Sequence, residues 1–80
     1  MNYSSVVITL SAASAADTLE KLSRMEGLEM HHVDASNHRA VGVIEAENTG
    51  LEVDLFERLR RTPGVVDVSL VSHLFEEEAQ

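Results

Sequence analysis

The sequence predicts an α+β domain with the element order βαββαβ, and three observations support this prediction. Four segments alternate apolar and polar residues, as half-buried strands do, and two segments between them have apolar residues at helical spacing. Each helical segment ends in a glycine that a further strand follows directly. The 80 residues are 44% hydrophobic and 25% charged, an ordinary globular composition. A chain of this size buries roughly 60% of its unfolded surface, so we expect one domain over residues 1–75.

The first half of the chain contains the first strand and the first helix. The strand is predicted over residues 3–10, where β-branched and small polar residues alternate. The helix is predicted from Ser14 to Gly27, because Ser14–Asp17 has the spacing of a capping box and Leu19 and Leu22 follow at helical spacing.

A predicted hairpin and a second helix follow. Strands are expected over residues 28–34 and 39–46, with a polar turn between them. Asn48 and Thr49 are good N-cap residues for a helix that Pro63-Gly64 would end. The fourth strand is expected from Val65 to Val71 or His73.

An internal repeat links the two halves, because Leu22–Leu28 is echoed by Leu59–Val65. Two βαβ units of this size, each with a right-handed crossover, form a four-stranded antiparallel sheet with both helices on one face. This is the ferredoxin-like fold, with the usual strand order 4-1-3-2. It leaves the other face of the sheet open.

Strand periodicity predicts which side chains lie on that open face. In the fourth strand, Val66, Val68 and Leu70 are expected to face the helices. The third strand stays ambiguous, because a shift of one residue would exchange its two faces. The residues predicted on the open face are Ser5, Val7, Thr9, Glu29, His31, Val33, Asp67, Ser69, Val71 and His73.

The composition argues against thiol chemistry, secretion and insertion into a membrane. The chain has no Cys, which excludes disulfides, thiolate metal sites and thiol catalysis. The apolar run Val6–Leu10 is too short for a secretory leader and no Lys or Arg precedes it, and no segment is long enough for membrane insertion. We therefore expect a cytoplasmic protein, with residues 76–80 as an acidic disordered tail.

The net charge is −8, from 6 Lys and Arg against 14 Asp and Glu. RNA-binding proteins of this topology need a basic surface and aromatic platforms, whereas this chain has only three aromatic residues. A nucleic-acid partner is therefore excluded. An acidic surface instead favours a basic protein or peptide partner.

Metal binding and catalysis find little support in the sequence. His31 and His32 are adjacent, and adjacent strand residues point to opposite faces, so they are not expected to chelate one ion. Acidic pairs such as Glu52 and Asp54 are expected on solvated surfaces, and no nucleophile motif or glycine-rich phosphate loop is present. We expect neither an enzyme nor a cofactor.

Several segments taken together resemble the NapD family, over nearly all of residues 4–76. They are Ser5-Val6-Val7-Ile8, Gly27-Leu28-Glu29-Met30-His31, Glu45-Ala46-Glu47, Pro63-Gly64-Val65 and Val68-Ser69-Leu70-Val71-Ser72-His73. The resemblance implies a cytoplasmic assembly chaperone of the periplasmic nitrate reductase. Such a chaperone binds the twin-arginine (Tat) signal peptide of the catalytic subunit and prevents premature export until cofactor insertion.

The resemblance also directs attention to carboxylates on the predicted sheet. Glu29, Glu45 and Asp67 are candidates to bind the two arginines of the peptide. Two departures from the family pattern are Glu26, where proline is expected, and Ser72, where the family often has tyrosine. An alternative function, a small-molecule-binding regulatory module of the same topology, stays open, and so does a weak homodimer.

Overall fold

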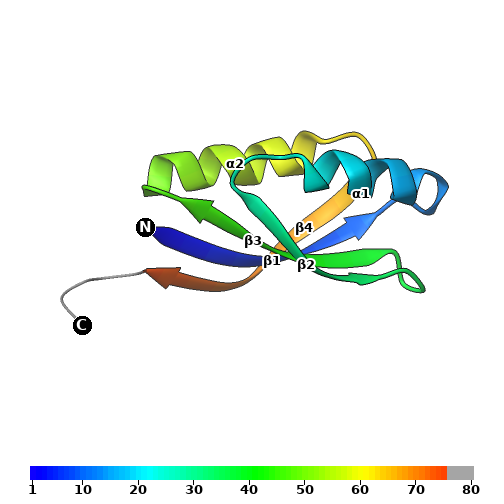
Figure 1. Ribbon diagram of the computed structural model, residues 1–80, viewed down its shortest axis with the longest axis horizontal. Coiled ribbons are helices and arrows are strands. Elements are labelled where there is room, and N and C mark those ends of the chain that lie inside the picture. The colour runs from blue at the N-terminus through cyan, green and yellow to red at the C-terminus, as the bar shows by residue number, and fades with distance from the viewer. Residues whose placement is uncertain (76–80) are drawn as a thin grey trace.

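Four antiparallel strands form one sheet, and two helices cover one of its faces, in the computed structural model of the protein (Figure 1). The structure describes residues 1–75, with the backbone alone for residues 72–75; the predicted tail, 76–80, lies outside the described residues. The elements are β1 (Asn2–Leu10), η1 (Ala12–Ser14, a 3₁₀ turn), α1 (Ala15–Ser23), β2 (Leu28–Asp34), β3 (Arg39–Ala46), α2 (Thr49–Arg61) and β4 (Val65–Phe75).

The sheet order is β2-β3-β1-β4, which confirms the predicted ferredoxin-like arrangement. The two longest pairings join β1 to β3 and β1 to β4, so β1 is central and β2 and β4 are the free edges. Within residues 1–75, neither helix combines the length and apolar composition needed to cross a bilayer.

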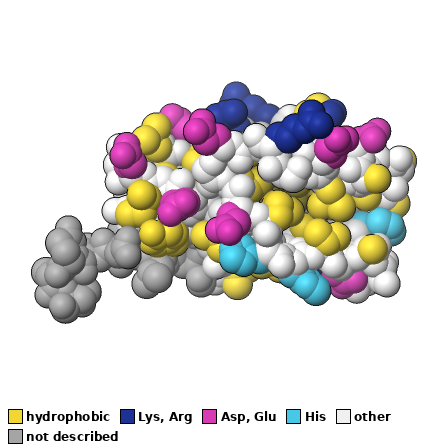
Figure 2. Space-filling view, in the orientation of Figure 1, with side chains coloured by type: hydrophobic (Ala, Val, Ile, Leu, Met, Phe, Trp, Pro, Cys, Tyr) yellow, Lys and Arg dark blue, Asp and Glu magenta, His cyan; other side chains and the backbone are white. Residues whose placement is uncertain are grey.

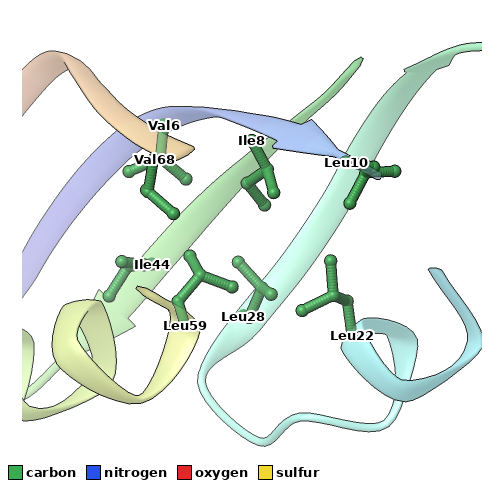
Figure 3. Close-up of a cluster of buried hydrophobic side chains, with 8 residues drawn as sticks. All are labelled: Val6, Ile8, Leu10, Leu22, Leu28, Ile44, Leu59 and Val68. Carbon is green, nitrogen blue, oxygen red and sulfur yellow. The ribbon is translucent and has the colours of Figure 1, made fainter. Parts of the chain in front are cut away.

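The core lies between the sheet and the helices. Val6 and Ile8 of β1 are fully buried and point toward Leu22 of α1 and Leu59 of α2, which are also fully buried (Figure 3). Burying an apolar side chain of this size stabilises the fold by about 1.5–3 kcal/mol. The strict alternation of buried and half-buried residues along β1 follows directly from the predicted period of two.

The structure resolves the ambiguity in β3. Ala40, Gly42 and Ile44 are buried on the helix side, whereas Val41 and Val43 lie on the open face. A Cβ atom at Gly42 would lie 3.1 Å from both Cδ1 of Leu28 and the backbone oxygen of Glu29, so a side chain would fit there only if these neighbours shifted. Atoms of β2 occupy the space beside residue 42.

Both glycines of the internal repeat adopt left-handed backbone conformations, with φ of 90° at Gly27 and 95° at Gly64. Side chains are unfavourable there, and a Cβ atom at Gly64 would lie 1.9 Å from Oγ1 of Thr18. That buried hydroxyl donates to the carbonyl oxygens of Ser14, at 2.9 Å, and Pro63, at 3.3 Å. Thr18 therefore joins α1 to the turn that leads into β4.

The helix ends differ in part from the prediction. Asn48 caps α2, since its side chain accepts a hydrogen bond from the Leu51 N–H at 2.9 Å. The capping box predicted at Ser14 does not form, because the chain enters α1 through a 3₁₀ turn and Ser14 makes no side-chain cap bond. Helix α1 also ends at Ser23, before Gly27, where tighter i→i−3 bonds from Arg24 and Met25 replace the helical pattern.

Candidate functional site

The open face of the sheet has an apolar centre built from β1 and β3. Val7 pairs directly with Val41, and Val43 pairs with Ser5. All three valines are half-buried although no helix covers them, because neighbouring side chains on the same face flank them. This centre offers a partner apolar contact across two adjacent strands.

Carboxylates surround the valines. Glu29 pairs with Val43, Glu45 follows two residues later on β3, and Asp67 lies opposite Thr9 on β4. Asp34 at the end of β2 is the fourth. Arginine forms bidentate hydrogen bonds to such groups, so the face suits a ligand that is both basic and apolar.

The cations of the protein lie mostly on the other side of the molecule. Arg39 is the one Lys or Arg on the open face, and the other five of the six belong to the two helices or the residue that ends α1. Figure 2 shows Lys and Arg side chains over the helices at the top of the view and the histidines along the lower, sheet side. The open face therefore holds one of the six cations beside its four carboxylates.

A β-bulge in β2 changes two predictions. Met30 pairs with Gly42 and His32 with Val41, so His31 is an extra residue with no partner on β3. From His32 onward, each residue of β2 therefore lies on the face opposite to the one that strict alternation predicts. Nε2 of His31 lies 3.7 Å from Oε1 of Glu29, so both are on the open face as predicted. His32 shares that face, and the expectation that the two histidines point to opposite faces is therefore wrong.

The same bulge moves Val33 to the other side of the sheet. Val33 pairs with the buried Ala40, and it lines a shallow apolar crevice with Leu10, Ala15 and Leu19 on the helix side. The prediction that Val33 lies on the open face is wrong, because one inserted residue reverses the face of every residue after it.

Two further bulges shape β4. Leu10 pairs with Val65 and Thr9 with Asp67, so Val66 is the extra residue. Val66 is 65% exposed, which corrects its assignment to the helix side, and Val65 takes its place against the core. Asp67 and Ser69, opposite Thr9 and Val7, lie on the open face as predicted.

The second bulge in β4 affects the end of the strand. Val6 pairs with Leu70 and Ser5 with Ser72, so Val71 is the extra residue and lies 62% exposed at the rim of the open face. The backbone of residue 73 pairs with Ser4, and the open-face assignment of His73 stays a prediction. The side chain of His73 lies outside the part that the structure describes.

The turn between β2 and β3 orders one of the four carboxylates. Asn37 donates to Asp34 through its side chain at 2.8 Å and through its backbone N–H at 3.4 Å. These bonds, the side-chain bond first, hold the pKa of Asp34 below its usual value of 3.8, and the nearby His32 acts in the same direction.

Glu52 is the acidic residue that sequence reasoning placed wrongly. It is only 7% exposed, in the first turn of α2. Its carboxylate accepts hydrogen bonds from Oγ of Ser4 and, at 3.2 Å, from Nδ2 of Asn2. The positive end of the helix also favours a carboxylate there. The sequence feature that could have indicated a buried partner for these groups is the pair of polar residues, Asn2 and Ser4, at positions of the first strand that otherwise face the core.

Sequence reasoning also missed several members of the site. Val41, Val43 and Arg39 were hidden by the ambiguity of the third strand, and His32 and Asp34 by the bulge. Within residues 1–75, no three His, Asp or Glu side chains are grouped so as to hold a metal ion.

The fold and this face define a small ferredoxin-like protein with an exposed, acidic sheet surface for a partner. The family model described as NapD protein matches residues 1–77. The chain therefore belongs to the NapD family. This confirms the family that the sequence pattern indicated.

Individual relatives agree with the family assignment. The proteins named Chaperone NapD from Escherichia coli strain K12 and from Shigella flexneri are each 30% identical over 76 residues, which cover 95% of this chain and 87% of theirs. The solution structure of the E. coli Tat proofreading chaperone protein NapD superposes with a TM-score of 0.82 at 29% identity, over 98% of this chain and 82% of that one.

Proposed function

We propose that this protein is a cytoplasmic chaperone that binds the twin-arginine signal peptide of a periplasmic nitrate reductase catalytic subunit and delays export until cofactor insertion. It would act as a binding protein, with no catalysis and no cofactor of its own. The observation that carries the proposal is the open sheet face, where an apolar valine centre lies among four carboxylates. A related protein, named a Tat proofreading chaperone, supports the same function.

The chemistry of the two partners is complementary. A twin-arginine signal peptide combines an arginine pair with an apolar stretch. The valines would contact the apolar stretch, and each guanidinium would form a bidentate pair with a carboxylate. The open face carries four carboxylates and one arginine, so its net charge is negative. This charge would also raise the association rate with a basic peptide.

The arrangement of charges favours one end of the face for the arginine pair. Arg39 pairs with Asp34 on one side and with Thr9 on the other, and Thr9 pairs with Asp67. Its positive charge therefore lies in the same row of the sheet as both aspartates. Glu29 and Glu45, at the opposite end, are diagonal neighbours on β2 and β3 with no Lys or Arg in the rows they occupy, and Nε2 of His31 lies 3.7 Å from Oε1 of Glu29. We place the arginine pair at these two glutamates.

Calorimetric titration tests this function. The purified protein is titrated with a synthetic twin-arginine signal peptide from the nitrate reductase of the same organism, and with a version carrying two lysines. We expect saturable one-to-one binding that weakens about tenfold with lysine, because an ammonium group cannot form the planar fork. Absence of binding by folded protein at tens of micromolar would contradict the proposal and return attention to the regulatory module.

Charge-reversal and apolar variants locate the surface. We expect Glu45→Lys, Asp67→Lys and Val71→Asp to weaken binding without unfolding the protein, with the largest loss for Glu45→Lys. All three side chains are exposed, so the melting temperature serves as the control. Unchanged affinity in all three would contradict the assignment of the face. A signal peptide from another exported redox enzyme tests whether nitrate reductase is the preferred partner.

A further inference from the structure

A second apolar feature lies outside the open face, in a crevice between the first turns of α2 and the free edge at β4. Its volume is about 280 Å³, and apolar atoms form almost all of its surface. This is smaller than the usual range for pockets that enclose a whole small molecule. The residues that line it are Ser4, Thr49, Glu52, Val53, Phe56 and Leu70.

Among the residues whose side chains the structure describes, the crevice offers no accessible charge. Glu52 is the charged residue in its lining, but that side chain is 7% exposed and is hydrogen-bonded by Ser4 and Asn2. Val53 and Leu70, in contrast, are 53% and 55% exposed. An apolar side chain entering the crevice would therefore bury hydrophobic surface without removing a charge from water.

The crevice lies beside the rim of the open face. Val71, at the rim of that face, is the chain neighbour of Leu70, which lines the crevice. Leu70 pairs with the buried Val6 and faces the helix side, whereas Val71 faces the open side, so these two apolar residues lie on the two sides of the same strand edge. Since β4 pairs only with β1, no other strand of the sheet covers this edge.

We propose that this crevice binds one bulky apolar side chain from the apolar stretch of the peptide whose arginines bind the open face. The inference rests on the proposed function and extends its binding surface around the β4 edge. Charge argues against the other occupants. A second copy of the chain would bring a further net charge of −8, and the segment 76–80 consists of three glutamates, one alanine and one glutamine.

The dimensions of the sheet fit a single peptide that reaches both places. Neighbouring strands are about 4.8 Å apart, so Glu29 on β2 and the β4 edge are separated by about 14 Å. A helical peptide covers that distance in about 10 residues, at 1.5 Å each. The side chain that enters the crevice is therefore expected about 10 or more residues after the arginine pair if the bound peptide is helical.

A pair of matched variants tests the inference. Val53→Asp places a charge at the crevice, and Val33→Asp makes the same change at the opposite edge of the sheet, where Val33 is 43% exposed and also on the helix side. We expect about tenfold weaker binding of the signal peptide by Val53→Asp and less than a twofold change for Val33→Asp. Melting temperatures of both variants check that each is folded.

A third variant, Val7→Asp at the centre of the open face, distinguishes failure of the proposed function from failure of the crevice inference. If the wild-type protein does not bind the peptide, the proposed function itself fails. If the wild-type protein binds and Val7→Asp weakens binding, but Val53→Asp and Val33→Asp bind alike, the crevice inference alone is overturned.

Substitution of the peptide identifies the side chain that enters the crevice. Each bulky apolar residue of the signal peptide is replaced by alanine in turn and titrated against the wild-type protein and Val53→Asp. We expect one alanine peptide that binds the wild-type protein more weakly but loses no further affinity for Val53→Asp. Strict additivity at every peptide position would overturn the inference. A wild-type dimer in sedimentation experiments that Val53→Asp dissociates would also overturn it, in favour of a second copy.

Discussion

The two faces of the sheet obey different physical requirements. Along β1, Val6 and Ile8 are fully buried beneath the helices, whereas Val7 between them is half-buried on the uncovered face. The helix side must exclude water to stabilise the fold, so its side chains are apolar or, like Glu52, fully hydrogen-bonded. The open side has no such requirement and can carry carboxylates that remain in contact with water. Along β1, substitutions at the even, buried positions should therefore lower stability, and substitutions at the odd positions on the open face should weaken peptide binding.

The largest expected effect comes from Ile8→Ala on the helix side. Removing most of a fully buried isoleucine side chain should lower the free energy of unfolding by about 2–5 kcal/mol, measured by urea denaturation. Val7→Ala should cost about 1 kcal/mol, because Val7 is half-buried, yet it should weaken peptide binding more than Ile8→Ala does. Equal losses of stability in the two variants would contradict the separation of the faces.

A backbone variant on the helix side should give the next largest effect. Gly64→Ala forces a side chain into a left-handed conformation, which alone costs about 1–2 kcal/mol, and its Cβ atom would clash with Oγ1 of Thr18. Thermal unfolding measures the loss, and peptide affinity should not change. Gly50→Ala is the control, since Gly50 lies within α2 and its nearest neighbour is Oδ1 of Asn48 at 3.3 Å. A Gly50→Ala variant as unstable as Gly64→Ala would rule out this explanation.

Two neighbouring serines sharpen the comparison. Ser4→Ala removes a donor to the buried carboxylate of Glu52 and should cost about 1–3 kcal/mol. Ser5→Ala lies on the open face and should change the free energy of unfolding by less than about 0.5 kcal/mol. The same chemical change at adjacent positions thus reports on opposite faces. Urea denaturation measures the free energy of unfolding of both variants. Equal decreases would contradict the assignment of Ser4 and Ser5 to opposite faces.

The smallest expected effect is on the pKa of Asp34, on the open side. Asn37→Ala removes the side-chain hydrogen bond to its carboxylate, which is the largest cause of the lowered pKa, and keeps the backbone one, so the pKa should rise toward 3.8 in an NMR titration. Because the folded pKa lies below the unfolded value, this carboxylate stabilises the fold above its unfolded pKa. That contribution is lost as the pH falls through the folded pKa. An unchanged pKa in the variant would show that Asn37 is not the cause.

Sequence periodicity predicted most of the fold but only part of the candidate site. The alternation in residues 3–10 and the two glycine turns identified the strands, their order and the faces of β1. The assignments of Val33 and Val66 failed because each follows or occupies a β-bulge. A bulge depends on how two strands are paired, and neither strand shows it when its sequence is examined alone.

The sequence alone determined the secondary-structure order, the family and the acidic charge, because local periodicity, turn residues and composition do not depend on distant contacts. Only the tertiary structure decided which residues share the open face, since the pairing of β3 with β1 and β2 determined that Ala40, Gly42 and Ile44 are buried on the helix side. It also decided that Glu52 is buried, because its partners Asn2 and Ser4 lie about fifty residues away in the chain. Burial and pairing across such separations depend on packing, which no single segment specifies.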